Sequence, residues 1–95
     1  MPPGYQAVQA AHAYVEFCVQ HPDIIAEWHE ISQYMCLLAV ENEAELSEYY
    51  SRAIGAGIKC VAFYEPDRDY EMTAICLEPS DVAAAVCANL PLALR

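Results

Sequence analysis

The sequence predicts an α/β fold in which a small mixed β-sheet of about three strands carries helices on both faces, in the order α-α-β-α-β-β-α. Three observations support this prediction. Four segments show the apolar spacing or the capping residues of helices, and three short segments are rich in apolar residues, as strands are. The chain has 95 residues, 57% of them hydrophobic, which is enough for one core. We therefore expect residues 1–95 to form a single domain.

Two helices are predicted in the N-terminal third. Two prolines open the chain, and proline is tolerated in the first turn of a helix. The first helix should run from about Tyr5 to Gln20, and its broad apolar arc predicts packing on more than one side. The pair His21-Pro22 ends it, because the residue before a proline is pushed out of the helical region. A shorter second helix is expected from Pro22 to about Ile31.

A strand, a helix and a second strand are predicted next. The apolar run Tyr34–Val40 is typical of a strand buried on both faces. Asn42 is a predicted N-cap with Glu45 three residues later, and the third helix should extend from there to about Gly55. The next strand is expected over Ile58–Glu65. This strand-helix-strand order predicts a partly parallel sheet.

The C-terminal third is predicted to contain a strand and a helix. The segment Tyr70–Glu78 has the composition of a strand, and the turn-forming residues 66–69 join it to the strand before it. Ser80 or Asp81 should cap a last helix that continues to about Leu90, where Pro91 stops it.

The charge of the chain limits its partners. Fourteen carboxylates against four basic residues give a formal net charge of −10. Non-specific affinity for nucleic acid comes from basic side chains, so a large basic groove is excluded, whereas a basic protein partner is favoured. The sequence contains neither a signal-peptide pattern nor an apolar run of about 18 residues. We therefore expect a cytoplasmic protein with no membrane partner.

The sequence predicts neither a metal site nor a cofactor. Its five cysteines are an odd number, form no CxxC pair and occur mostly in apolar runs, so we expect buried free thiols in a reducing compartment. The acidic stretch around Arg68 lacks the glycine and the spacing of a calcium loop. It is interpreted as a solvated turn with one local ion pair.

Three polar residues of the first predicted helix share one face. Gln9, His12 and Glu16 follow one another at three- and four-residue spacings. In one interpretation Gln9 orients a water or a carbonyl group, and His12 carries a proton, for which its pKa near neutrality is suited. In the other, His12 is a partly buried core histidine and Glu16 is its solvated neighbour. The spacing alone leaves both open.

The same segment resembles a motif of a known family. Gly4, Tyr5, Ala7, Val8, Gln9, His12 and Ala13 stand in the places of G-K-x-A-A-Q-x-x-H-A, a motif of the peptidyl-tRNA hydrolase family of the archaeal and eukaryotic type. The resemblance covers nearly the whole chain and includes the segment Pro22–Trp28 and Thr73 in TAICLEP. Tyr5 replaces the lysine of the motif, and the first strand of the family is absent from the sequence.

The resemblance implies a hydrolase acting on the ester of peptidyl- or aminoacyl-tRNA. In that reading Glu65 stands near the place of the family's aspartate and could be the base, while Gln9 or Thr73 donates a hydrogen bond to the oxyanion. Tyr5 could donate through its hydroxyl, and Trp28 could stack on a base of the substrate.

The loss of the lysine leaves a second function open. A catalytically inactive protein of the same fold could bind a small nucleotide-like ligand or a basic protein partner. The missing strand further predicts an exposed sheet edge that a second copy covers, and hence a homo-oligomer.

Overall fold

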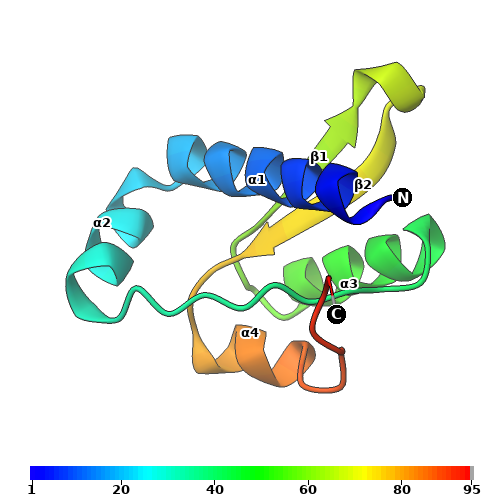
Figure 1. Ribbon diagram of the computed structural model, residues 1–95. Helices are drawn as coiled ribbons and strands as arrows, with labels where there is room; N and C mark the ends of the chain where they lie inside the picture. Colours follow the sequence, from blue (N-terminus) through cyan, green and yellow to red (C-terminus); the bar gives the residue numbers. More distant parts are fainter. Residues whose placement is uncertain (95) are drawn as a thin grey trace.

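Four helices surround a two-stranded antiparallel sheet in the computed structural model, which describes residues 1–94 (Figure 1). The elements are α1 (Pro3–Gln20), α2 (Pro22–Ile31), α3 (Glu43–Gly55), β1 (Cys60–Glu65), the 3-10 turn η1 (Pro66–Arg68), β2 (Glu71–Leu77) and α4 (Asp81–Val86). The α/β class and the predicted order of segments are confirmed. The sheet has two strands where about three were expected.

The missing strand is the first one predicted, Tyr34–Val40, which crosses the molecule as an extended segment between α2 and α3 (Figure 1). Its pairing is limited to an isolated antiparallel bridge between Leu38 and Leu92. The prediction of a partly parallel sheet is therefore wrong. An apolar run favours extended backbone, but a sheet strand also needs a neighbour that continues the hydrogen-bond ladder, and the bridge ends after one pair.

The sheet is a hairpin with a bulge. Its register runs from Cys60 opposite Leu77 to Phe63 opposite Ala74, and then shifts, so that Tyr64 lies opposite Met72. Thr73 is left without a residue opposite it. A bulge of this kind turns a side chain away from the face that strict alternation gives it, and this one occurs beside the candidate site.

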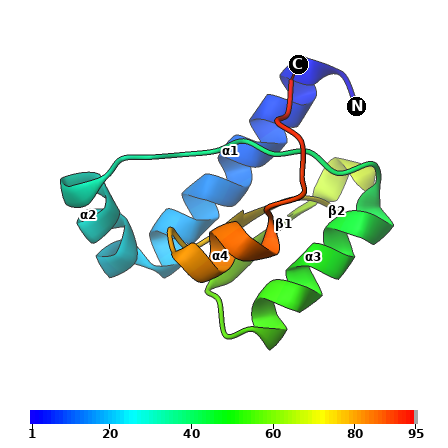
Figure 2. The same ribbon diagram turned by 90° about the horizontal axis from the view of Figure 1, so that it is seen from below.

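Helices cover both faces of the sheet, as predicted. Helix α1 crosses one face, and α3 lies on the other with α4 beside it (Figures 1 and 2). The side chains that α1 buries are Gln9, Ala13 and Phe17. Between the sheet, α3 and α4, a second apolar layer is formed by the buried residues Ala53, Ile58, Cys60 and Ala83.

The predicted capping residues start their helices as expected, with one difference at a helix end. The side chain of Asn42 accepts a hydrogen bond from the Glu45 amide at 2.9 Å, and Ser80 accepts one from the Ala83 amide at 3.1 Å. Helix α4 ends at Val86 and not at Leu90, because the amides of Ala88 and Leu90 bond to carbonyls three residues back, which tightens the last turn.

Helix α1 packs on one side only, contrary to the prediction. Val8, Val15 and Val19 on its outer side are 52%, 54% and 71% exposed. The expectation of buried thiols is also only partly met. Cys60 is buried and Cys36 is exposed, while Cys18, Cys76 and Cys87 are half-buried, and all five are free. Within residues 1–94 no helix is long and apolar enough to cross a membrane.

Candidate functional site

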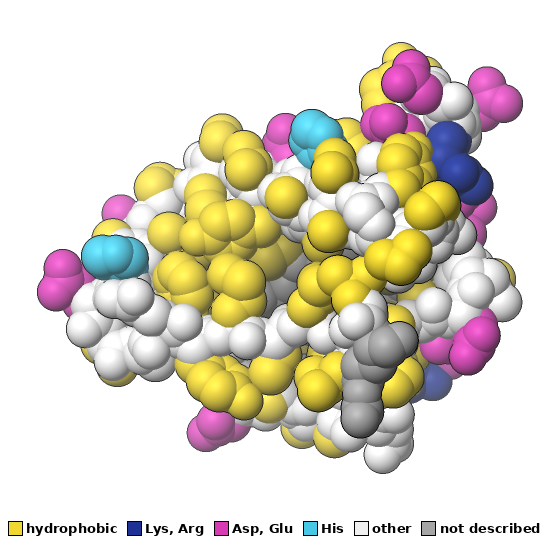
Figure 3. Space-filling view, viewed as in Figure 1, with side chains coloured by type: hydrophobic (Ala, Val, Ile, Leu, Met, Phe, Trp, Pro, Cys, Tyr) yellow, Lys and Arg dark blue, Asp and Glu magenta, His cyan; other side chains and the backbone are white. Residues whose placement is uncertain are grey.

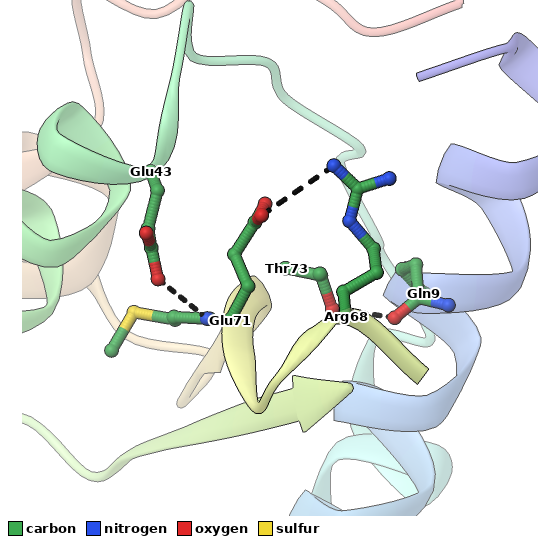
Figure 4. A network of polar contacts seen from close by, with 6 residues as sticks. Gln9, Glu43, Arg68, Glu71 and Thr73 are labelled. Carbon is green, nitrogen blue, oxygen red and sulfur yellow. Dashed lines mark hydrogen bonds and ion pairs between the residues drawn. The ribbon is translucent and has the colours of Figure 1, made fainter. Parts of the chain in front are cut away.

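A buried hydrogen bond joins α1 to the bulge of β2. The hydroxyl of Thr73 donates to Oε1 of Gln9 at 2.5 Å, and the two side chains are 8% and 1% exposed (Figure 4). In strict alternation Thr73 would share the face of Ile75, which packs against the core on the α3 side. The bulge directs Thr73 toward α1 instead. Two of the predicted site residues, 64 positions apart in the sequence, are thereby brought together.

The amide nitrogen of Gln9 is free to donate. Within residues 1–94 the side chain of Gln9 makes its hydrogen bond through Oε1, and every fully buried side-chain nitrogen or oxygen there has a partner. The small exposed part of Gln9 therefore includes Nε2. Gln9 as a whole is 1% exposed, so this N–H donor lies just beneath the surface, in a side chain that is otherwise immobilised in the core.

His12 lies one turn further along α1 and stacks on an aromatic ring of β1. The rings of His12 and Phe63 are nearly parallel, with an interplanar angle of 9° and centroids 4.5 Å apart. His12 itself is exposed, so it is not the core histidine of the alternative interpretation. Stacking engages a face of the imidazole and leaves the nitrogen atoms at its edge available for hydrogen bonds.

Arg68 provides positive charge near the start of α1. Its guanidinium lies over the ring of Tyr5, 5.8 Å from the centroid, and forms an ion pair with Glu71 at 3.4 Å (Figure 4). The predicted local ion pair of this turn is confirmed. Tyr5 is neutral and stands in the place of the lysine in the motif that this segment resembles. Arg68 therefore brings a positive charge close to that place.

Glu43 holds the bulge from the opposite side. Its Oε2 accepts a hydrogen bond from the backbone amide of Met72 at 2.8 Å, so the first turn of α3 is tied to the residue before Thr73 (Figure 4). In the sequence, Glu43 is one of several acidic residues at the start of a helix, where the helix dipole favours negative charge. Its contact with β2 depends on the tertiary structure.

The remaining two candidates lie on other elements than Gln9 and Thr73. Glu65 is half-buried at the end of β1 and, by alternation, on the same face as Phe63. Trp28 lies in α2, which follows the C-terminal end of α1 (Figure 1). It packs edge-on against Tyr14 and donates from Nε1 to the Tyr34 carbonyl at 2.8 Å, so it holds the start of the extended segment.

Two contributors to the site were missed by sequence reasoning. Phe63 was assigned only to a strand, and Arg68 only to a turn. The sheet register places Phe63 on the face that α1 crosses. Phe63 can therefore be identified as a neighbour of the α1 motif residues only once that register is known. Arg68 is one of only four basic residues in the sequence, and this scarcity was the signal that could have marked it as a candidate site residue.

The site opens beside a large apolar hollow. This hollow has a volume of about 1160 Å³ and is lined by α1, β2, the extended segment and α4. Figure 3 shows hydrophobic side chains around it, between α1 and the extended segment. Gln6, Arg68 and Thr73 belong to the same lining.

A comparison with protein families gives one match that covers almost the whole chain. The sequence profile of the family described as Peptidyl-tRNA hydrolase PTH2 matches residues 1–92. No curated protein matches the chain.

Proposed function

Because the chain belongs to the peptidyl-tRNA hydrolase PTH2 family, we propose that it hydrolyses the ester bond of peptidyl- or aminoacyl-tRNA in the cytoplasm. The observation that supports this most is the Gln9–Thr73 hydrogen bond, which fixes an amide side chain in the core while its nitrogen keeps an unused N–H donor just beneath the surface. Such a rigid donor suits a carbonyl oxygen that becomes negatively charged during the reaction.

The reaction begins with attack of a water molecule on the ester carbonyl carbon. As the new C–O bond forms, the carbonyl oxygen becomes an oxyanion and accepts a hydrogen bond from Nε2 of Gln9. Thr73 acts as a positioning residue, because its hydroxyl fixes Oε1 and with it the direction of Nε2. Tyr5 contributes a hydroxyl donor at the start of the same helix.

His12 accepts the proton of the attacking water. The tetrahedral intermediate then collapses, the bond to the ribose oxygen breaks, and His12 returns the proton to that oxygen. Glu65, on the β1 face that carries Phe63, is the second candidate base. Arg68 attracts the phosphates of the tRNA, a role for which its always-charged guanidinium is suited.

The test is the release of the acyl group from an N-blocked, labelled aminoacyl-tRNA. We expect release by the unmodified chain and a loss of about 10²-fold with His12→Ala, in the range typical of a removed acid–base group. His29→Ala is the matched control, because His29 is an exposed histidine on α2, away from the site. If His12→Ala and His29→Ala retain the same rate, the role given to His12 is wrong.

A second candidate function is a catalytically inactive binding protein for a small nucleotide-like ligand or a basic protein. The net charge of −10 and the neutral Tyr5 favour it. Release no faster than in buffer, together with saturable binding of AMP that Gln9→Ala weakens, would support this function over hydrolysis.

A further inference from the structure

The large hollow lies between two extended segments of the chain, β2 and residues 34–40. Apolar side chains from α1 and from α4 line it above and below (Figure 3). Those of α1 are Ala10, Tyr14 and Phe17, and those of α4 and the turn after it are Ala83, Ala84 and Cys87. A chain placed between the segments would therefore meet apolar surface on both faces, the environment of a central strand.

One edge of β2 is paired and the other faces this hollow. The Glu78 amide donates to the Lys59 carbonyl at 2.9 Å, which sets the alternation of the ladder. By that alternation Cys76 exchanges backbone bonds with β1, whereas the N–H and C=O groups of Ile75 and Leu77 point to the opposite edge.

The extended segment also directs backbone groups into the hollow. The Ala39 amide donates to the Pro91 carbonyl, and the Ala93 amide donates to the Leu37 carbonyl, each at 2.9 Å. These bonds flank Leu38, whose own N–H and C=O therefore point to the other side, away from residues 91–93. Leu38 is part of the lining of the hollow.

The two segments run in opposite directions. The bond from the Met72 amide to Glu43 places the end of the extended segment beside the start of β2, as the course of the chain in Figure 1 also shows. A strand seated between them is thus antiparallel to one neighbour and parallel to the other, and it can accept and donate hydrogen bonds on both edges.

The charges at the hollow select what enters it. Its charged lining residues are Glu41, Glu43, Glu71, Glu78, Asp81 and Arg68. Among the side chains of residues 1–94 that line the hollow, five are acidic, and the one basic side chain is already paired with Glu71. A second copy of this chain also carries a net charge of −10, so it would be repelled by this lining. Charge complementarity therefore favours a different, basic occupant.

We propose that this hollow is a strand-acceptor site for another polypeptide, whose extended apolar segment of about six residues is flanked by Lys or Arg. The segment pairs with β2 on one edge and with residues 34–40 on the other, and its flanking cations face the acidic lining. Main-chain bonds supply affinity and the alternating side chains supply selectivity, as in other cases of strand addition.

The test uses the synthetic peptide KKVIVIVKK, measured by calorimetry and by hydrogen exchange of the full chain. We expect saturable binding, and exchange at the amides of Leu38, Ile75 and Leu77 slowed about tenfold or more. The amide of Cys76, which already pairs with β1, should be unchanged. The same peptide N-methylated at every second residue, and the peptide EEVIVIVEE, should each bind at least about tenfold more weakly.

A pair of proline variants tests the geometry. Leu38→Pro removes an N–H that points into the hollow and leaves both flanking bonds intact, so it should weaken peptide binding. Ala39→Pro removes the bond to Pro91 instead and should affect stability more than the pairing itself. Equal binding of the N-methylated peptide, or no binding of any peptide, overturns the proposal. A concentration-dependent dimer that protects Ile75 and Leu38 without peptide also overturns it, and would support the homo-oligomer expected from the sequence.

Discussion

At the scale of single residues, the buried pair Gln9 and Thr73 is the most informative feature of the molecule. A buried amide is costly unless its oxygen has a partner, and the Thr73 hydroxyl provides that partner. An apolar pair would fill the same place without this cost. The polar pair is better explained by what the unpaired amide nitrogen of Gln9 can donate to.

Two substitutions of Thr73 separate packing from hydrogen bonding. Thr73→Val keeps the shape of the side chain but leaves Oε1 of Gln9 buried without a donor, which should cost about 1–3 kcal/mol in the free energy of unfolding. Acyl release should fall in kcat with little change in KM, because the donor direction is lost and not the substrate contacts. Thr73→Ser keeps the hydroxyl and should restore most of the rate. If Val and Ser variants release the acyl group equally fast, Thr73 does not position Gln9.

Arg68 can be compared with a closely matched arginine elsewhere. Arg52 also pairs with a glutamate, Glu48, and also lies over a tyrosine ring, Tyr49, at 4.9 Å, but on α3. Arg68→Gln should raise KM for the charged tRNA about tenfold, a loss of about 1.4 kcal/mol, and should lower the salt dependence of KM by about one counterion. Arg52→Gln should leave both unchanged. Equal effects of the two substitutions would mean that only net charge matters.

The sequence was informative about those site residues that belong to a local motif. Gln9 and His12 share one face of a helix and match a family pattern, so both could be proposed before the fold was known. The contact of Gln9 with Thr73 could not, because it depends on a bulge, and one extra residue in a strand leaves no clear mark in an apolar run. For the same reason, the role of Phe63 could be predicted only with the sheet register known, and that of Arg68 only with the turn geometry known.

At the scale of elements, α3 and β2 are joined at the bulge. Glu43 and Glu45 both lie in the first turn of α3, where the helix dipole favours negative charge. Only Glu43 also accepts the Met72 amide of β2. The two glutamates therefore allow the tertiary contact to be measured apart from the helix effect.

Glu43→Ala should be more destabilising than Glu45→Ala. Both lose the favourable charge at the helix start, but Glu43→Ala also removes a charge-assisted hydrogen bond and should cost about 1–2 kcal/mol more in urea unfolding. The exchange of the Met72 amide should become faster in that variant alone. Equal free energies of unfolding would show that the Glu43 contact does not stabilise the bulge.

Helices were easier to predict than strands in this chain. Asn42 and Ser80 gave correct helix starts because capping depends on neighbours three residues away. The segment Tyr34–Val40 was correctly expected to be extended, but its role in a sheet depended on a distant partner. The partner is the C-terminal segment around Leu92, which pairs with Leu38 for a single bridge.

At the scale of the whole molecule, negative charge dominates the composition, while Cys60 is buried and Cys76 is half-buried. The net charge of −10 gives little general affinity for polynucleotides, so substrate binding rests on few contacts, Arg68 among them. Burial raises the pKa of the Cys60 thiol to about 12 and that of Cys76 to about 11, from an ordinary value of 9.0. Nearby cysteines contribute to both shifts in the same direction.

These raised pKa values predict a loss of stability in alkali. Below pH 9 the thiols are neutral in both the folded and the unfolded chain, so their contribution is fully present. Between pH 9 and about 11 the unfolded chain loses these protons while the folded chain keeps them. The free energy of unfolding should therefore fall as pH rises, by less than about 1.4 kcal/mol per pH unit for each thiol, since solvent screens part of the effect.

Urea unfolding at pH 7, 9, 10 and 11 measures this loss, and Cys60→Ala, which removes one titrating thiol, should flatten the decline above pH 9. Cys36→Ala is the control, because Cys36 is exposed and should leave the slope unchanged. The same contrast should appear in alkylation at pH 8, where iodoacetamide modifies Cys36 first and Cys60 last, because the thiolate is the nucleophile and burial suppresses it. A slope that Cys36→Ala flattens as much as Cys60→Ala would place the alkaline titration outside the core.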